Sequence, residues 1–233
     1  FGETRKTALV SGNNNLKLDY EPAYNPPTIS GQERAAVLQN NAYQFTPVAG
    51  AKSYQWRHQR RVPMAEAEGA ENGLTRVEAK TSAGYEVIDT FIQASGTQSF
   101  HLAQPNVEPQ TLTLKRVFKV GTGSHLQFSS RLGQAGTGQS AKAQVSTDRG
   151  ATWQTVWSQV GTETEGELMF TRRSIALSTF ADQDVMVRFS YDIQSGTFFF
   201  QTDSGVGFYI DDIFVTEAEE FFEEVIRDVS LGT

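Results

Sequence analysis

The sequence predicts an all-β fold, a two-sheet antiparallel jelly-roll sandwich that ends in a short acidic C-terminal helix or tail. Apolar and polar residues alternate with period two in many short runs, which is typical of strands with one wet and one dry face. Turn signals that contain Gly separate these runs. Runs of the helix formers Ala, Leu, Glu and Lys are rare before residue 217.

Composition limits the class of protein. Hydrophobic residues make up 38% of the 233 residues, so the chain can bury a core. No run approaches the ~18 consecutive apolar residues of a membrane span. The absence of Cys excludes disulfides, thiolate zinc sites and cysteine nucleophiles. The net charge of -7 argues against nucleic acid as the main partner, because phosphate neutralisation needs clustered Lys and Arg.

The first third of the chain is the least regular. Pro26-Pro27 marks a junction, so residues 1–27 are predicted to be an N-terminal extension or the tail of a preceding domain. Residues 28–83 are predicted to form a β-hairpin and loop region that packs on the sandwich or extends it. The two hairpin strands would be Ala42–Val48 and Ser53–Arg57.

Residues 84–216 carry the predicted jelly roll. Alternation is clearest in Asp184–Asp192, where one face collects the apolar side chains of Val185, Val187, Phe189 and Tyr191.

Residues 217–233 form the predicted acidic C-terminal extension. They hold six acidic side chains and one Arg, so the rest of the chain is nearly neutral. The apolar residues of this segment have the spacing of one stripe of a short helix: Phe221, Phe222, Val225 and Ile226.

The sharpest short motif is Ser146-Thr-Asp148-Arg-Gly150-Ala-Thr-Trp153, which matches an Asp-box pattern. Asp148 is suited to accept backbone N–H groups, Gly150 permits a positive φ, and Trp153 packs back on a hairpin. Sialidase propellers carry several copies of this pattern, whereas this chain has one. A structural turn is therefore favoured over a sialidase.

Two adjacent carboxylates, Asp211 and Asp212, lie inside the apolar run Gly205–Val215. Their side chains point to opposite faces of a strand, so at least one faces the core or the rim of a sheet. A buried carboxylate needs compensation. A structural Ca²⁺ ion, an Arg side chain and backbone amides all remain open as its partner.

Several motifs in fixed order resemble the MAM-like jelly-roll modules of secreted bacterial proteins, over residues 84–216. They are "SGTQSFHL" (95–102), "TLTLKRVF" (111–118), "AQVSTDRGATW" (143–153), "RRSIALSTFADQDVMVRFSYD" (172–192) and "GVGFYIDDIFV" (205–215). Phe208 stands where that family usually has Trp. The stretch "YQFTPVAGAKSYQW" (43–56) resembles a fibronectin-III-like hairpin.

The resemblance implies a two-sheet jelly roll with an Asp pair near a structural metal. MAM-like modules accompany immune-inhibitor-A-type metallopeptidases and other cell-surface enzymes. A secreted or cell-surface bacterial protein is therefore expected. The lack of Cys agrees with this expectation, since animal MAM domains use disulfides.

Catalytic signatures are sparse. HExxH, GxSxG and GxxxxGK[ST] are all absent. Glu66, Glu68 and Glu71 come close to the carboxylate spacing of jelly-roll glucanases, but the segment rich in Ala and Gly favours a solvated loop. The chain is therefore predicted not to be an enzyme, although a parent protein with hydrolase activity stays open.

Aromatic and basic residues are the candidate ligand contacts. Phe198 and Phe199 cannot both point inward in an extended segment, so one ring is either an exposed platform for a sugar or covered by other strands. Trp157 is similarly ambiguous. Trp56 with Arg57 and Arg60 would suit a sulfated or uronic glycan, and a solvated hairpin end is the alternative.

The predicted function is a non-catalytic accessory module of a secreted bacterial multidomain protein that binds a polysaccharide or cell-surface glycan in adhesion. The alternative is a structural domain that packs against a neighbouring peptidase or glycosidase domain and binds no small ligand.

Overall fold

The computed structural model describes residues 29–30, 44–46, 48–49, 53–103, 109–196 and 204–230. In strand residues 29, 45, 53–61 and 221–230 it describes the backbone alone. Internal contacts divide the chain into a larger unit, residues 59–224, and a smaller unit, residues 1–58 with 225–233. The segment boundaries predicted from the sequence lie near residues 28, 84 and 217.

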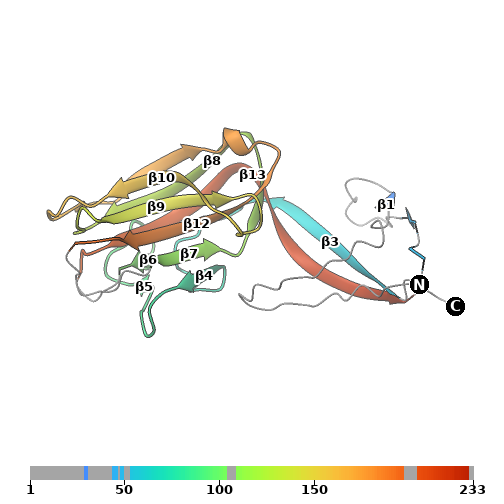
Figure 1. Cartoon of the computed structure of the whole chain (residues 1–233), viewed down its shortest axis with the longest axis horizontal. Helices are drawn as coiled ribbons and strands as arrows, with labels where there is room; N and C mark the ends of the chain where they lie inside the picture. The colour runs from blue at the N-terminus through green and yellow to red at the C-terminus, as the bar shows by residue number, and fades with distance from the viewer. Residues whose placement is uncertain are drawn as a thin grey trace. The chain divides into compact units, whose positions relative to one another are not determined.

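The regular elements of the described chain are strands and one short 3₁₀ helix (Figure 1). They are β1 (Ile29–Ser30), β2 (Gln44–Phe45), β3 (Ser53–Pro63), β4 (Val77–Lys80), β5 (Ile88–Asp89), β6 (Ser99–Leu102), β7 (Gln110–Leu114), β8 (Val117–Leu132), β9 (Gln139–Ser146), β10 (Gln154–Val160), β11 (Thr171–Ala176), η1 (Ser178–Phe180), β12 (Asp184–Ile193) and β13 (Phe208–Ser230). No helix in these ranges is long and apolar enough to cross a membrane.

Eleven strands form one continuous sheet that folds over on itself. One half has the order β5-β6-β13-β8-β11, and the other has the order β4-β7-β12-β9-β10. The eleventh strand, β3, pairs with β13. All of the registered pairs between these strands are antiparallel. The halves join where Asp184 and Val185 of β12 pair with Lys119 and Phe118 of β8.

Aromatic rings from both halves meet in the core. Phe128 of β8 packs edge-on against Phe189 of β12 at a centroid distance of 4.9 Å, and Phe208 of β13 stacks at 6.0 Å on Trp157 of β10. Contacts across the two halves make the fold a two-sheet sandwich, which confirms the predicted class.

The alternation predicted for Asp184–Asp192 is confirmed. All four apolar side chains of its inner face are buried: Val185, Val187, Phe189 and Tyr191. The strand is central, because β7 and β9 pair with its two edges.

The C-terminal segment is strand rather than the predicted helix. β13 runs unbroken to Ser230, and Ala218–Phe221 pair with Val117–Val120 of β8. The helical spacing of the apolar residues is outweighed by strand pairing, because the residues just before the stripe pair with β8 and β3 also pairs with β13. An isolated helix of this length is only marginally stable in water.

Pairing in the first third also differs from the sequence expectation. β2 pairs with β1, and β3 pairs with β13, so the described residues of Ala42–Val48 and Ser53–Arg57 are not partners of each other. Long-range pairing of this kind leaves no local signature in a sequence.

Candidate ligand-binding site

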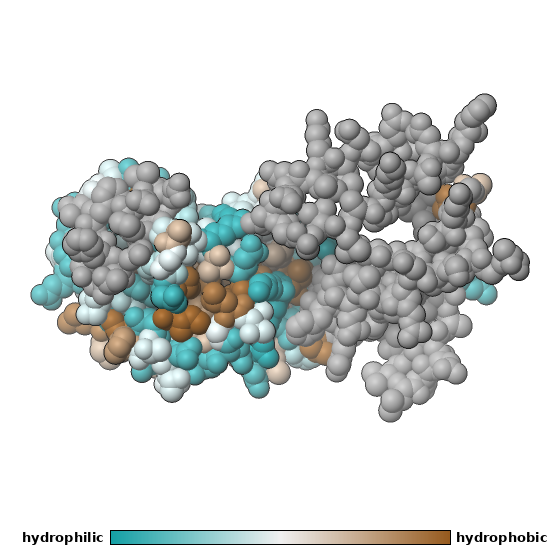
Figure 2. All heavy atoms as spheres, turned by 90° about the horizontal axis from the view of Figure 1, so that it is seen from below, coloured by the Kyte–Doolittle hydropathy of each residue, from teal (hydrophilic) through white to brown (hydrophobic). Residues whose placement is uncertain are grey.

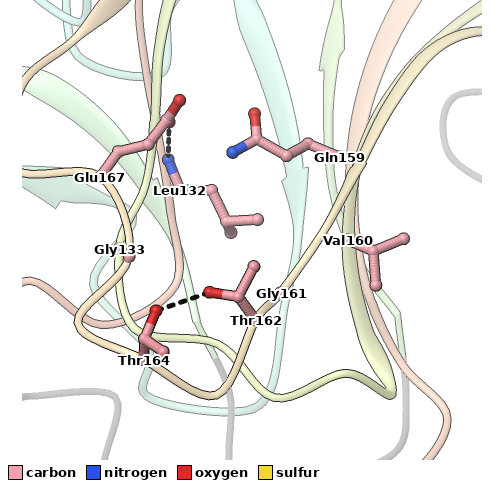
Figure 3. A pocket seen from close by; sticks show the side chains of 9 residues that line it. Leu132, Gly133, Gln159, Val160, Gly161, Thr162, Thr164 and Glu167 are labelled. Carbon is pink, nitrogen blue, oxygen red and sulfur yellow. Dashed lines mark hydrogen bonds between the residues drawn. The ribbon is translucent and has the colours of Figure 1, made fainter.

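A half-open pocket lies where the end of β10 meets the loop that leads to β11 (Figure 3). Its volume is about 150 Å³. Its lining residues are Leu132 and Gly133 at the end of β8, Gln159, Val160 and Gly161 at the end of β10, and Thr162, Thr164, Gly166 and Glu167 in the loop. Figure 3 shows the Gln159 amide on one side and the Thr162 and Thr164 hydroxyls on the other. The pocket therefore offers mainly uncharged hydrogen-bonding groups.

Arg173 on β11 holds the wall of the pocket together. Its Nη2 donates to Oε1 of Glu167 at 2.7 Å and to Oε1 of Gln159 at 2.9 Å, and its Nε donates to the Ser130 hydroxyl at 3.0 Å. The second carboxylate oxygen of Glu167 accepts the backbone N–H of Leu132 at 2.7 Å. The charge of Glu167 is therefore paired, and the amide nitrogen of Gln159 is the part of that side chain left to meet a ligand.

Three glycines let the backbone segments around the pocket approach each other closely. A Cβ added at Gly133 would lie 1.8 Å from the carbonyl oxygen of Gly205, and one added at Gly161 would lie 2.4 Å from that of Ala135. Gly166 has a φ of 71°, and a Cβ there would lie 2.2 Å from the Gly133 carbonyl oxygen. These positions admit only Gly, so the pocket is built on a tightly packed backbone frame.

Trp157 lies beside this site but is not an open platform. Its ring packs edge-on against Phe128 at 5.3 Å and stacks on Phe208. The Arg173 guanidinium lies over the indole, 5.3 Å from the ring centroid. The half-buried indole thus supports Arg173 and offers no free face to a sugar.

The other predicted ligand contacts fall outside what the structure describes. Phe198 and Phe199 lie between residues 196 and 204, which is outside the described residues. Trp56, Arg57 and Arg60 belong to β3, in a stretch described by its backbone alone.

The Asp-box residues form the turn between β9 and β10. Asp148 Oδ1 accepts the Thr152 N–H at 2.8 Å and the Ser146 hydroxyl at 2.7 Å, and Oδ2 accepts the Thr152 hydroxyl at 2.6 Å. Gly150 has a φ of 89°, and Trp153 Nε1 donates to its carbonyl oxygen at 3.1 Å. These hydrogen bonds lower the pKa of Asp148 to about 2. The Thr152 hydroxyl contributes most, followed by the Thr152 N–H and the Ser146 hydroxyl.

Asp211 and Asp212 are satisfied by amides and hydroxyls. Asp211 Oδ2 accepts the N–H groups of Ala94 at 2.9 Å and Ser95 at 3.1 Å, and its Oδ1 accepts the Asp212 N–H at 2.7 Å. Asp212 accepts the hydroxyls of Ser95 at 2.5 Å and Ser129 at 2.9 Å. Asp212 also has a φ of 51°, at a register shift that breaks the simple alternation of β13. Of the partners left open by the sequence, the structure provides backbone amides.

This donor set satisfies Asp211 without a calcium ion. N–H groups point at both oxygens of Asp211, and an N–H group cannot coordinate a cation. Within the described ranges, no group of three or more His, Cys, Asp or Glu side chains could hold a metal ion. Calcium binding stays a prediction from the sequence.

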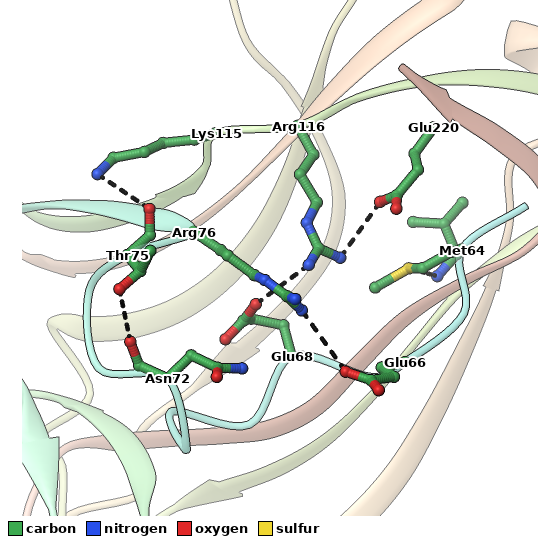
Figure 4. A network of polar contacts seen from close by, with 10 residues as sticks. Met64, Glu66, Glu68, Asn72, Thr75, Arg76, Lys115, Arg116 and Glu220 are labelled. Atoms are coloured by element: carbon green, nitrogen blue, oxygen red, sulfur yellow. Dashed lines mark hydrogen bonds and ion pairs between the residues drawn. The ribbon is translucent and has the colours of Figure 1, made fainter. Parts of the chain in front are cut away.

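Two buried carboxylates share one guanidinium just before β8 (Figure 4). Arg116 Nη2 lies 3.6 Å from Glu68 Oε2, and Arg116 Nη1 lies 3.3 Å from Glu220 Oε2. Glu68 is 1% exposed, and its two carboxylate oxygens accept no hydrogen bond in the part of the chain that the structure describes. Burial raises the pKa of Glu68, although Arg116 opposes the shift. Arg116 is thus the cation that offsets the cost of burying both carboxylates.

The carboxylates of residues 66–71 do not converge on one site. Glu66 is exposed and lies 3.8 Å from Arg76. Glu71 points away from Glu68 to a different loop, where it accepts the N–H of Thr97 at 2.7 Å. These three side chains therefore do not form the facing pair that glycoside hydrolysis needs.

The sequence did not single out Gln159, Glu167 or Arg173. Arg172 and Arg173 are adjacent in the chain and point to opposite faces of β11, so only the pairing of β11 with β8 shows which one reaches the pocket. The three glycines around the pocket were the sequence feature that could have indicated it, but loops are rich in Gly for many reasons.

No protein-family model and no curated protein matches the sequence. Among solved structures, the chain is similar to TmCBM61 in complex with β-1,4-galactotriose, with 14% identity and a TM-score of 0.39 over 65% of this chain and 98% of that one. It is also similar to carbohydrate-binding modules from the β-sandwich superfamily, with 13% identity and a TM-score of 0.42 over 83% of this chain and 76% of that one. A third is the glycoside hydrolase domain of Endo-D from Streptococcus pneumoniae R6, with 12% identity and a TM-score of 0.38 over 71% of this chain and 21% of that one. Likeness this remote assigns neither a ligand nor an activity to the chain.

Proposed function

We propose that this chain is a non-catalytic accessory module that binds neutral glycans in the pocket at the end of β10. The observation that carries the proposal is the set of uncharged hydrogen-bonding groups there, the Gln159 amide and the Thr162 and Thr164 hydroxyls. Sugar hydroxyls both donate and accept hydrogen bonds, so amide and hydroxyl side chains are suited to them. The tightly packed frame keeps the cost of ordering these groups low.

Charges near the pocket favour neutral glycans over acidic ones. Glu167 is paired by Arg173, whereas Glu163 and Glu165 are exposed on the same loop. A sulfate or a uronic carboxylate would approach these negative charges while Arg173 is already engaged.

Apolar side chains accompany the polar groups. Val160 lines the pocket with 55% of its surface exposed, and the exposed Leu168 and Met169 follow Glu167 in the chain. Apolar surface beside convergent polar groups suits the mixed CH and hydroxyl surface of a sugar.

The wider setting is part of the same proposal. The module would belong to a secreted or cell-surface bacterial protein, with the MAM-like motif order of residues 84–216 and the lack of Cys as support. The second candidate, a structural domain for a neighbouring catalytic domain, stays a prediction from the sequence.

The proposal is tested by glycan-array screening, followed by calorimetry with matched neutral and sulfated forms of the best oligosaccharide. We expect the neutral form to bind more tightly. Gln159→Ala and Thr162→Val should each weaken binding about 3- to 10-fold, the worth of about 0.5–1.5 kcal/mol for one hydrogen bond. Gln154→Ala, on the exposed start of the same strand, is the matched control and should bind like the wild type. Tighter binding of the sulfated form, or equal loss in the control, contradicts the proposal.

A further inference from the structure

The loop between β5 and β6, residues 90–98, is held by carboxylates that lie outside it. Each of three carboxylates accepts two backbone N–H groups of this 90–98 loop. The sets are Asp89 with Phe91 and Ile92, Asp211 with Ala94 and Ser95, and Glu71 with Thr97 and Gln98, at 2.7–3.1 Å. Six of its N–H groups are thus bound without any regular secondary structure.

Further contacts restrain the same loop. The Ser99 hydroxyl donates to the Ile92 carbonyl oxygen at 2.6 Å. Gly96 has a φ of 62°, and a Cβ there would lie 2.4 Å from Glu71 Oε1, so the carboxylate packs directly on the backbone. The conformational entropy of the 90–98 loop is therefore lost on folding and need not be lost again when a ligand binds.

This restrained loop presents a bare aromatic ring. Phe91 is 88% exposed, the largest exposure of any large hydrophobic residue in the described ranges. Burying such a ring is worth about 1.5–3 kcal/mol, and the folded chain leaves that free energy unused. Single exposed apolar residues are common on protein surfaces, and Figure 2 shows small apolar groups among hydrophilic ones on one face. Phe91 differs because its backbone is locked in place.

The loop that carries the ring is uncharged. Residues 90–98 contain no Asp, Glu, Lys or Arg. Thr90 and Gln93, which flank the ring in sequence, are exposed, whereas Ile92 is half-buried. The carboxylates that hold the loop are turned toward its backbone. The loop thus displays one aromatic face beside hydroxyl and amide groups.

We propose that the 90–98 loop is a second saccharide-binding site, in which Phe91 stacks on the CH face of a neutral sugar ring. Gln93 and Thr90 bind the hydroxyls at the edge of that ring. An aromatic face and neutral polar groups are complementary to the two kinds of surface that a sugar presents. A protein-binding hot spot is a poorer match, because such anchors sit in the middle of well-packed patches and the exposed residues that flank Phe91 in sequence, Thr90 and Gln93, are polar. The site is separate from the pocket at β10 and rests on the proposed function only for the class of ligand.

The test is saturation-transfer NMR on the full chain with three neutral probes: β-1,4-galactotriose, cellotetraose and maltotetraose. Wild type should transfer saturation to at least one probe. In a chain that already carries Gln159→Ala, adding Phe91→Ala should remove at least about five-sixths of the saturation transfer that remains. Adding Phe91→Tyr instead should retain this transfer, because the ring face persists. The ring is mostly exposed, so Phe91→Ala should unfold at the wild-type denaturant concentration. Leu74→Ala, which trims another exposed apolar side chain outside the loop, is the control and should change nothing.

A further variant tests whether the restrained backbone matters. Asp89→Ala removes the acceptor of two loop N–H groups without touching the ring, and it should weaken probe binding about 3- to 10-fold. Three results overturn the proposal: no transfer from wild type to any probe, no loss in Phe91→Ala, or loss in Phe91→Tyr as complete as in Phe91→Ala. If Gln159→Ala abolishes all binding, the 90–98 loop is not a site and the pocket stands. If Phe91→Ala abolishes all binding, the pocket is not a site and the loop stands.

Discussion

Replacing Arg173 by Ala removes the side chain that joins the pocket wall to the core. In the structure, Arg173 donates to Glu167 at 2.7 Å, to Gln159 at 2.9 Å and to Ser130 at 3.0 Å, and it covers the indole of Trp157. We expect Arg173→Ala to destabilise the fold and to weaken glycan binding at the pocket, since Gln159 and Glu167 lose the group that positions them.

The size of the effect follows from these contacts. The side chains of Arg173 and Glu167 are 21% and 25% exposed, so their ion pair is worth less than a fully buried one, about 1 kcal/mol. The hydrogen bonds to Gln159 and Ser130 add about 1 kcal/mol together, and the contact with Trp157 adds about 0.5–1 kcal/mol. The expected loss in the free energy of unfolding is about 2–3 kcal/mol.

Urea denaturation followed by circular dichroism measures this loss as a lower midpoint with an unchanged slope. Arg172→Ala is the matched control, because among the described residues the hydrogen bond of the exposed Arg172 side chain goes to Gln127, at 2.9 Å on the outer face. It should cost less than about 0.5 kcal/mol. Arg173→Lys should be intermediate, since it keeps the charge and loses the forked donor geometry. The reasoning is refuted if Arg173→Ala stays within about 0.5 kcal/mol of wild type, or if both Ala variants cost the same.

Four other predictions concern the remaining carboxylates and their partners. The pKa of Asp148 lies at about 2, below the ordinary 3.8, so its contribution to stability is present above about pH 4 and is lost as pH falls toward 2. In Asp148→Asn, the free energy of unfolding should therefore depend less on pH in this range. The pKa of Glu68 is raised, so stability should fall as pH rises above about 4.5, and Glu68→Gln should remove that slope in urea melts from pH 4 to 8. Arg116→Met, by contrast, leaves two carboxylates without their cation and should cost about 3–5 kcal/mol; a loss no larger than that of Glu68→Gln would refute the proposed cluster. Because amides already satisfy Asp211, the fold does not need a cation there, and we expect neither calcium nor EDTA to shift the melting temperature; a rise of several degrees with calcium would instead support the calcium site predicted from the sequence.

Local patterns in the sequence predicted the sandwich well. The alternation of Val185, Val187 and Phe189 shows directly in β12, because a two-residue period has one meaning in a strand with a buried face. The Asp148–Trp153 turn also depends only on residues within one short segment.

Features that depend on distant pairing were not predictable. The helical stripe at Phe221–Ile226 is real as a pattern, but the residues before it pair with β8, which starts about a hundred residues earlier in the chain. The positive φ of Asp212 shifts the register of β13 and cannot be inferred from parity. The pocket likewise depends on Arg173 reaching across from β11 to Gln159 of β10. No periodic pattern records that contact.

The central claim is tested most directly by calorimetric titration of wild type and Gln159→Ala with the best neutral oligosaccharide from the array. We expect measurable one-to-one or two-to-one binding by wild type and about 3- to 10-fold weaker binding at the pocket in the variant. No heat of binding with wild type, or equal affinity in Gln159→Ala and the Gln154→Ala control, would contradict it.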